Sequence, residues 1–302
     1  MGVHYPNLKA VTAKQSQPTS SFSIGNDEMS SVHLDGNSPV FILGPCVIEG
    51  EEFIWELASN LKTISLEIGI PFIFKASYDK ANRTSSDSFR GPGIVEGCRM
   101  LYEIGKELKV PVTTDVHTVE EVEKAAEKID LLQIPAFLCR QTDLIHAAGR
   151  SGRAVNVKKG QFLAPWDVMP IANKLRSVGC DNFLFTERGT TFGYNNLVAD
   201  MRSLFWMREE GCRVVFDATH SVQKPGGLGD KSSGDGYLAP VLAKAAVATG
   251  CDGVFIETHP DPDKAKSDGP NQIPLNDLSS VLKTLVAIHE IATSGSMGKN
   301  NV

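Results

Sequence analysis

The sequence of 302 residues lacks the features that define several classes of protein. It has no run of about 18 apolar residues, which a membrane-spanning helix requires, and no apolar stretch after a basic start, which a signal peptide requires. Its six cysteines show no CxxC spacing, which in a chain this long indicates a reduced intracellular protein without a disulfide framework. We therefore expect a cytoplasmic protein with no membrane partner, although the Ser-rich start leaves organelle import open.

An excess of positive charge is also missing. Thirty Lys and Arg against 36 Asp and Glu give a formal charge of −6, so we expect no nucleic-acid partner. An anionic substrate would therefore need a local basic cluster within an acidic background. The remaining composition, with 41% hydrophobic and 22% charged residues, is that of an ordinary globular protein with a large core.

Short β-rich runs alternate with helical stretches from residue 39 onward, and no linker interrupts the series. Their even recurrence, with no GxGxxG after the first run, favours a (β/α)8 TIM barrel over a doubly wound sheet. We predict one barrel domain over residues 39–293, between an N-terminal extension (1–38) and a C-terminal tail (294–302). The predicted strands are residues 40–43, 72–75, 110–115, 130–134, 154–157, 183–186, 213–217 and 253–257.

Local patterns add detail to this prediction. Apolar residues recur at helical spacing in two sets, which are Ile54, Leu57, Ala58 and Leu61, and Leu278, Val281, Leu282 and Leu285. Thr118 and Glu121 have the separation of a capping box, which predicts a helix start. The segment SFSIGNDEMSSVHL (21–34) is either a hairpin that closes the bottom of the barrel or part of a disordered tail.

Polar side chains follow each predicted strand. Sites in TIM barrels are built at the carboxyl ends of the strands, and a buried polar group without a partner is costly, so we expect these residues to form a site. The residues are Cys46, Lys75, Lys80, Asp115, Gln133, Lys158, Lys159, Arg188, His220 and Glu257.

Two groups of these residues differ in chemistry. The first is a cationic set suited to binding phosphates and a carboxylate. Any one of these cations alone would more commonly be a solvated surface charge. Five of them near strand ends in an acidic chain favour an anion-binding site. Its members are Lys75, Lys80, Arg83, Lys158 and Arg188. The second has the sulfur, imidazole and carboxylate donors that suit a divalent transition metal, and its members are Cys46, His220, Glu257 and Asp268. Alone, Cys46 or His220 would be interpreted as a core residue. His117 and His259 also lie near strand ends, but they are weaker candidates for metal ligands.

The motifs together resemble the 3-deoxy-D-manno-octulosonate 8-phosphate synthase family over about residues 39–293. The segments that carry the resemblance are GPCVIE, FKASYDKANRTS, RGPG, TDVH, QIPAFLCRQTDL, NVKKGQF, ERGTTFGYNNLVADM, FDATHS and ETHPDPDKAKSDGP. KANRTS (80–85) discriminates best, because the related 3-deoxy-arabino-heptulosonate 7-phosphate synthases have a KPRTS-like segment there. The resemblance implies a barrel enzyme of lipopolysaccharide biosynthesis that condenses phosphoenolpyruvate with arabinose 5-phosphate and water, releasing phosphate.

The resemblance also implies roles for individual residues. Lys158 and Arg188 would hold the phosphate of phosphoenolpyruvate, and Lys75 and Lys80 its carboxylate and reacting end. Arabinose 5-phosphate would be received by Asn82, Arg83 and Thr84, with Gln133 and Asp115 shaping the site. Arg140 would reach into a neighbour's site, which implies a homotetramer. The implied catalytic residues are Lys80, Asn82, Asp115 and His220.

Cys46 places the chain with the metal-dependent class of that family, whose metal-independent members have Asn at this position. The resemblance makes His220, Glu257 and Asp268 the other ligands, and such a set accepts Zn, Fe, Mn or Co. One departure from the family pattern is SSGDGYLAP (232–240), so the contacts of the loop over residues 223–237 are not carried over. Two other functions stay open: a heptulosonate synthase, and a non-catalytic sugar-phosphate-binding barrel.

Overall fold

A closed barrel of parallel strands forms the centre of the computed structural model, which describes residues 21–25, 31–81, 88–225 and 233–294. Each strand pairs with the next, and β14 returns to pair with β3, so the predicted (β/α)8 TIM barrel is confirmed. In spatial order the strands are β3 (Val40–Gly44), β4 (Phe72–Lys75), β5 (Val112–Asp115), β6 (Leu131–Ile134), β7 (Ala154–Lys158), β8 (Phe183–Glu187), β11 (Arg213–Asp217) and β14 (Gly253–His259).

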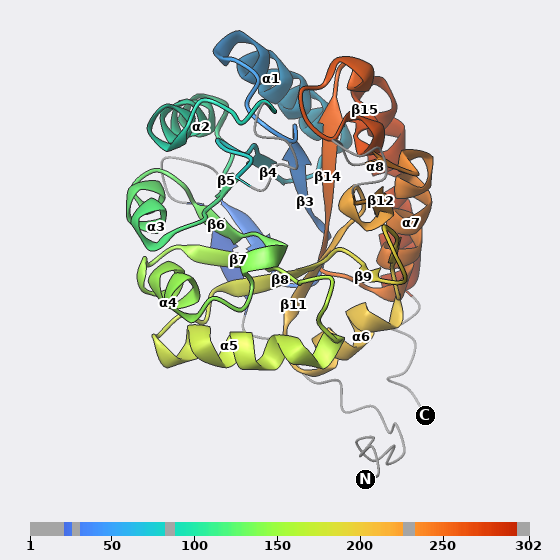
Figure 1. Ribbon diagram of the computed structural model, residues 1–302. Helices are drawn as coiled ribbons and strands as arrows, with labels where there is room; N and C mark the ends of the chain where they lie inside the picture. The colour runs from blue at the N-terminus through green and yellow to red at the C-terminus, as the bar shows by residue number, and fades with distance from the viewer. Residues whose placement is uncertain (1–20, 26–30, 82–87, 226–232, 295–302) are drawn as a thin grey trace.

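Helices surround the barrel (Figure 1). They are α1 (Glu51–Ile68), α2 (Ile94–Leu108), α3 (Val119–Ala126), α4 (Thr142–Arg150), α5 (Val168–Ser177), α6 (Arg202–Glu209), α7 (Ala239–Thr249) and α8 (Leu275–Ser294). The predicted apolar face of α1 is fully buried, and on α8 Val281 is partly buried beside its three buried neighbours. Burial of these faces against the strands drives the helices onto the barrel. None of the helices in the described ranges has the length and apolar run that a bilayer span requires.

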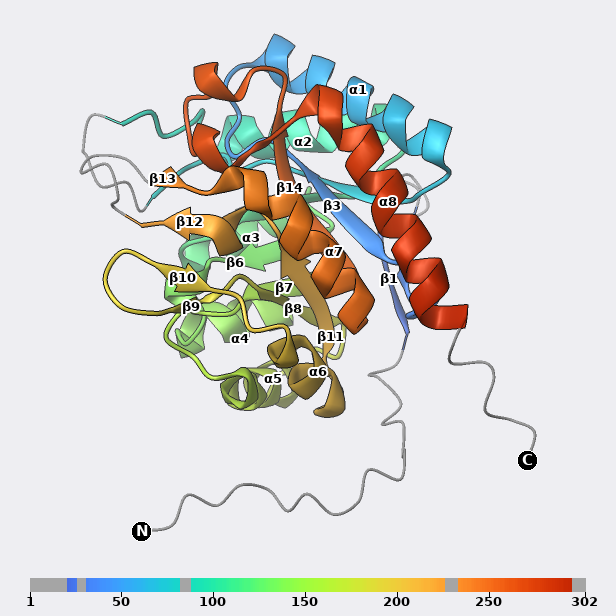
Figure 2. The same ribbon diagram turned by 90° about the vertical axis from the view of Figure 1, so that its right-hand side faces the viewer.

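The N-terminal hairpin closes the bottom of the barrel. β1 (Phe22–Ile24) and β2 (Val32–Leu34) pair antiparallel, at the opposite end of the barrel from the loop hairpins (Figure 2). Phe22, Ile24, Val32 and Leu34 are buried in one cluster with residues from the barrel interior. The hairpin interpretation of this segment is therefore confirmed over the paired residues, because their apolar side chains seal the open end of the interior.

Inside the barrel, an apolar layer lies below a polar one. Seven interior residues continue the cluster of the hairpin upward: Ile42, Ile73, Leu131, Ala154, Leu184, Val215 and Phe255. Side chains on a strand alternate between faces, so the residue two positions later points into the same interior. Six of these later residues are polar and buried: Lys75, Gln133, Asn156, Thr186, Asp217 and Glu257. The sequence thus fills the lower barrel with apolar groups and keeps the polar groups for the upper end.

Short elements build the loops at the carboxyl end. The strands are β9 (Thr190–Thr191), β10 (Leu197–Val198), β12 (Gln223–Lys224), β13 (Ser233–Gly234) and β15 (Ile273–Pro274). The 3-10 helices are η1 (Ala136–Leu138), η2 (Pro165–Asp167), η3 (His220–Val222), η4 (Gly236–Leu238), η5 (Pro262–Lys264) and η6 (Gly269–Asn271). β9 pairs with β10 and β12 with β13, and both hairpins project beyond the barrel strands (Figure 2).

The predicted cap of α3 forms only in one direction. Thr118 Oγ1 accepts a hydrogen bond from Glu121 N at 3.3 Å, as a capping residue does. The Glu121 carboxylate does not complete the box at Thr118, because its Oε2 accepts from His117 N and from Tyr78 Oη, each at 2.7 Å. The capping-box prediction therefore identified the start of the helix but misplaced the partner of Glu121.

Candidate active site

The structure brings most of the predicted site residues together at the carboxyl end of the barrel. Lys75, Lys158 and Arg188 are nearly inaccessible to solvent, and so are Cys46, Asp115, Gln133 and Glu257. Lys80, His220 and Asp268 are partly buried. Asn82, Arg83 and Thr84 lie outside the described residues. The upper barrel therefore holds several charged groups in one desolvated space.

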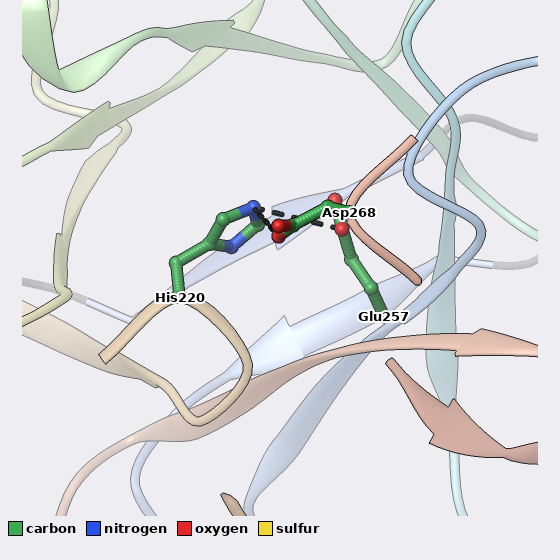
Figure 3. Close-up of side chains that lie close together, drawn as sticks. All are labelled: His220, Glu257 and Asp268. Carbon is green, nitrogen blue, oxygen red and sulfur yellow. Dashed lines mark ion pairs between the residues drawn. The ribbon is translucent and has the colours of Figure 1, made fainter. Parts of the chain in front are cut away.

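Three possible metal ligands converge from separate parts of the chain: Glu257 lies in β14, His220 begins η3, and Asp268 precedes η6 (Figure 3). The ligand atoms of His220, Glu257 and Asp268 all lie within 4.8 Å of one another. His220 Nε2 is 3.5 Å from Glu257 Oε2 and 3.7 Å from Asp268 Oδ2. Glu257 Oε2 is buried and has no hydrogen-bond partner among the described residues. An imidazole nitrogen and two carboxylates facing one point form a donor set that suits a divalent ion.

Asp217 orients His220 and was missed in the sequence analysis. Its Oδ2 lies 2.8 Å from His220 Nδ1, and its Oδ1 accepts from His220 N at 2.9 Å. The same Oδ2 accepts from Lys158 Nζ at 2.7 Å. A carboxylate on Nδ1 leaves Nε2 free to act as a ligand, which is the usual support for a metal-binding histidine. The available signal was the alternation of β11, because Asp217 follows Val215 by two residues on the interior face.

Cys46 lies beside the loop that carries Asp268. Its Sγ is 2.8 Å from Ser267 Oγ, and it is not one of the three residues whose ligand atoms lie within 4.8 Å. Burial, reinforced by the negative charge of Glu257, raises the pKa of the Cys46 thiol to about 11. The thiol is therefore protonated at neutral pH in the metal-free protein, and it would lose this proton on binding a cation.

Lys75 links the ends of β3 and β14. Its ammonium donates to Glu257 Oε1 at 2.5 Å and to the Cys46 carbonyl at 3.0 Å. Strands β3 and β4 approach so closely that a Cβ on Gly44 would lie 1.8 Å from the Lys75 carbonyl oxygen, so only glycine fits there. Burial would raise the pKa of Glu257, but the nearby positive charges, led by Lys75, lower it to about 2. Glu257 is therefore an anion at neutral pH.

Arg188 and Lys158 place positive charge deep in the site. Burial lowers the pKa of both groups, more than the neighbouring carboxylates raise it. Arg188 Nη2 donates to Gln223 Oε1 at 2.6 Å and to the His220 carbonyl at 3.3 Å, which are both neutral acceptors. Lys158 Nζ also lies 3.8 Å from the centre of the Phe255 ring. A buried guanidinium bonded to neutral groups favours an anionic ligand.

Asp115 and Gln133 form a buried pair at the base of the site. Gln133 Nε2 donates to Asp115 Oδ1 at 2.6 Å, and Ser77 Oγ donates to Asp115 Oδ2 at 2.5 Å. Burial opposes ionisation of Asp115, but the charges of Lys80 and Lys75 hold its pKa well below its usual range. The neighbouring Cys46 side chain and the Glu257 and Asp115 carboxylates likewise outweigh burial and raise the pKa of Lys80. Opposite charges thus stabilise one another where water is excluded.

Other sequence candidates have hydrogen-bond or ion-pair partners outside this cluster. Arg140 is exposed, and its carbonyl accepts from Lys174 Nζ at 3.0 Å. Lys159, the second lysine of its pair, is buried 3.5 Å from Glu187 and donates to the Leu163 carbonyl at 3.0 Å. The two weaker histidine candidates have carboxylate neighbours of their own, since His117 Nδ1 is 2.9 Å from Glu121 and His259 Nε2 is 3.6 Å from Glu49.

Comparison with known proteins agrees with this site. Residues 20–294 match the model of the DAHP synthetase I family. The 2-dehydro-3-deoxyphosphooctonate aldolase of Geotalea uraniireducens is 57% identical over 270 residues, which are 89% of this chain and 97% of that protein. The aldolases of the same name from Azoarcus sp. (57% over 85% of this chain and 94% of that protein) and Geobacter metallireducens (56% over 90% and 99%) are also similar. The compound in this name is 3-deoxy-D-manno-octulosonate 8-phosphate, so the chain belongs to the DAHP synthetase I family and, within it, to the synthases that its motifs resemble.

Proposed function

We propose that the chain condenses phosphoenolpyruvate with arabinose 5-phosphate and water, giving 3-deoxy-D-manno-octulosonate 8-phosphate and phosphate. The observation that carries this proposal is the closeness of buried cations to the His220, Glu257 and Asp268 cluster at one end of the barrel. Two phosphorylated substrates require such cations, and relatives with 57% identity carry the corresponding name. A new carbon–carbon bond joins the methylene carbon of phosphoenolpyruvate to the sugar aldehyde carbon. Water adds to the second carbon of phosphoenolpyruvate as its phosphate leaves.

The buried cations would bind phosphoenolpyruvate. Lys158 and Arg188 suit its phosphate, because Arg188 hydrogen-bonds to neutral acceptors and can give its charge to a ligand. Lys75 and Lys80 suit its carboxylate and reacting end. The contact of Lys158 with Asp217 fixes the ammonium before substrate arrives, so that less ordering is needed on binding.

A divalent metal, held by His220, Glu257, Asp268 and Cys46, would complete the site. The buried and unpartnered Glu257 Oε2 fits this role, because a cation would replace the hydrogen bond that it lacks. The donor set of thiol, imidazole and carboxylates suits Zn, Fe, Mn or Co. When bound, the ion supplies a Lewis acid that polarises a substrate oxygen. Asp217 supports this use because its Oδ2 lies at Nδ1 of His220, so Nε2 would be the nitrogen that holds the ion.

The second substrate would be bound by residues of two chains. Asn82, Arg83 and Thr84 would receive arabinose 5-phosphate from one chain. Arg140, exposed after β6, would reach its phosphate from a neighbouring chain in a homotetramer. All six cysteines are buried and unpaired, which supports a place of action in the reducing cytoplasm.

A direct assay tests this function. Phosphoenolpyruvate consumption and phosphate release are measured with arabinose 5-phosphate, and separately with erythrose 4-phosphate, the substrate of the heptulosonate synthases. We expect turnover with arabinose 5-phosphate and loss of that turnover after treatment with a chelator. Preference for erythrose 4-phosphate would identify a heptulosonate synthase, and binding without turnover would identify a non-catalytic barrel.

A further inference from the structure

A row of five polar side chains crosses the interior of the barrel below Lys158 and Arg188. Its members come from consecutive strands: Ser77 follows β4, Asp115 ends β5, Gln133 is in β6, Asn156 in β7 and Thr186 in β8. We call this row the interior ladder. All five side chains are buried, and Ser77, Asn156 and Thr186 have no measurable solvent exposure. The strand register places Gln133 directly between Asp115 and Asn156.

Each member of the ladder hydrogen-bonds to the next. Thr186 Oγ1 donates to Asn156 Oδ1 at 2.7 Å, and Asn156 Nδ2 donates to Gln133 Oε1 at 2.9 Å. Gln133 Nε2 then donates to Asp115 Oδ1 at 2.6 Å. From the other side, Ser77 Oγ donates to Asp115 Oδ2 at 2.5 Å. Both oxygens of Asp115 are therefore held by donors of the ladder.

The direction of every bond follows from the carboxylate. An ionised carboxylate only accepts hydrogen bonds, so Gln133 must turn its NH₂ group toward Asp115 and its oxygen toward Asn156. Asn156 must then turn its NH₂ group toward Gln133 and its oxygen toward Thr186. An amide oxygen only accepts, so the Thr186 hydroxyl must be the donor. The Thr186 hydroxyl therefore closes the row at its far end, where it pairs with the Asn156 oxygen in the orientation that Asp115 requires.

The ladder lies directly beneath the proposed phosphate site. Lys158 follows Asn156 by two residues, and Arg188 follows Thr186 by two residues, so each pair points into the same interior. The layer below is apolar, including Ala154 on the same strand. Apolar residues would also fill the ladder level, as they fill most barrels. Burying polar side chains at this depth costs free energy unless each of them is hydrogen-bonded. A polar row in place of an apolar layer therefore indicates a functional role.

We propose that Thr186 and Asn156 are positioning residues of the condensation, which fix the Gln133 amide and, through it, the Asp115 carboxylate. This inference rests on the proposed function. Neither residue was a candidate in the sequence analysis. Without the Thr186 donor, the Asn156 oxygen is buried without its hydrogen bond, so the Asn156 amide is no longer held in place and supports the Gln133 oxygen less firmly. A Gln133 amide that can move would no longer hold Asp115 Oδ1 firmly, and Asp115 would shift away from its place beside the site.

Two substitutions at Thr186 separate orientation from packing. Thr186→Val keeps the shape of the side chain and removes the donor, whereas Thr186→Ser keeps the donor and removes a methyl group. We expect Thr186→Val to lower kcat by about ten- to a hundredfold, the scale of a small misplacement of reacting groups. The KM for phosphoenolpyruvate should change by less than about threefold, because Lys158 and Arg188 remain. Thr186→Ser should retain most of the wild-type kcat.

Thr113→Val is the matched control. Thr113 is equally buried in β5, and its hydroxyl donates to the Leu131 carbonyl at 2.7 Å, outside the ladder. Its loss should lower thermal stability to a degree similar to Thr186→Val and leave kcat near the wild-type value. The double variant Thr186→Val with Asn156→Leu should lose no more kcat than Asn156→Leu alone, because both remove the same bond.

The outcomes decide between the proposals. If the wild-type protein turns over neither aldose phosphate, the proposed function is overturned, and the positioning role with it. If the wild type is active and Thr186→Val keeps its kcat, the ladder has no positioning role. Equal losses in Thr186→Val and Thr186→Ser would also overturn the inference, because packing and not the hydroxyl would then matter.

Discussion

Lys158 and His220 share a single oxygen atom, Oδ2 of Asp217, at 2.7 and 2.8 Å. One buried carboxylate thus connects the proposed phosphate site to the proposed metal site. Burial would raise the pKa of Asp217, but its interactions with His220 and Lys158 hold it far below the usual range of an aspartate. Asp217 is therefore an anion that neutralises one group and orients the other.

Asp217→Asn should impair both halves of the site. The amide keeps the shape but removes the charge that pairs with Lys158 and supports His220. We expect metal affinity to fall by about ten- to a hundredfold, the usual effect of losing such a supporting carboxylate. Metal content after dialysis against a buffered metal series measures this effect. Asp200→Asn, which changes a partly exposed carboxylate paired with Arg202, is the control and should bind metal as the wild type does.

Cys46 should release a proton when the metal binds. Its thiol has a pKa of about 11, so the folded, metal-free protein carries the proton throughout the neutral range. Because the proton competes with the ion, apparent metal affinity should rise with pH by about tenfold per pH unit from this group, up to its pKa. Calorimetric titrations in buffers of different ionisation enthalpy count the released protons. Cys46→Asn should release about one proton fewer than the wild type.

The same variants test whether Cys46 is a ligand. Cys46→Ala should bind metal far more weakly and lose most activity, whereas Cys46→Asn should keep low activity that a chelator does not abolish. Cys251→Ala removes another buried cysteine, far along the chain, and should leave the proton count unchanged. Equal proton release by Cys46→Asn and the wild type would show that the thiol does not bind the ion.

The fold was largely predictable because its signals are local and repeated. Each predicted strand overlaps an observed one, since apolar runs, turns and helix faces recur with every unit. The site was predictable in part, because a barrel brings the residues at its strand ends to one place. Asp217, Asn156 and Thr186 were missed, although alternation from Val215, Ala154 and Leu184 places them inside the barrel.

Side-chain pairing explains what the sequence did not reveal. Lys158 and Lys159 are adjacent and chemically identical, yet one faces the interior and the other forms an ion pair with Glu187. Only the alternation of side chains between the two faces of a strand separates the two lysines. Likewise, the contact between Cys46 and Ser267 joins residues 221 positions apart in the sequence. No local sequence pattern can predict a contact between residues so far apart.

Arg188→Ala should weaken binding of phosphoenolpyruvate specifically. Arg188 is 5% exposed, so its removal takes a forked donor from a desolvated phosphate site. We expect a loss on the order of 2–5 kcal/mol, seen mainly in the KM for phosphoenolpyruvate. Arg202→Ala removes an exposed arginine and should change neither KM. A change confined to the KM for arabinose 5-phosphate would contradict the division of the cationic set.

Activity should depend on association if Arg140 completes a neighbour's site. Arg140 is exposed on its own chain, so the proposal requires a second chain to bring it to a substrate. Arg140→Ala should inactivate the site of the neighbouring chain, whereas Lys158→Ala should inactivate the site of the chain that carries it. Each variant alone should therefore have little activity. Size-exclusion chromatography of the wild-type protein should show a tetramer.

Mixing the two inactive variants tests the shared site directly. After co-refolding in equal amounts, about a quarter of the sites should combine an intact Lys158 from an Arg140→Ala chain with an intact Arg140 from a Lys158→Ala neighbour. Activity should return to about that fraction of the wild-type value, and mixing without refolding should restore none if the oligomers do not exchange. If Arg140→Ala alone stays active, Arg140 is a surface residue. If no mixture recovers activity, Arg140 serves its own barrel, because a defect confined to one chain cannot be repaired by its neighbour.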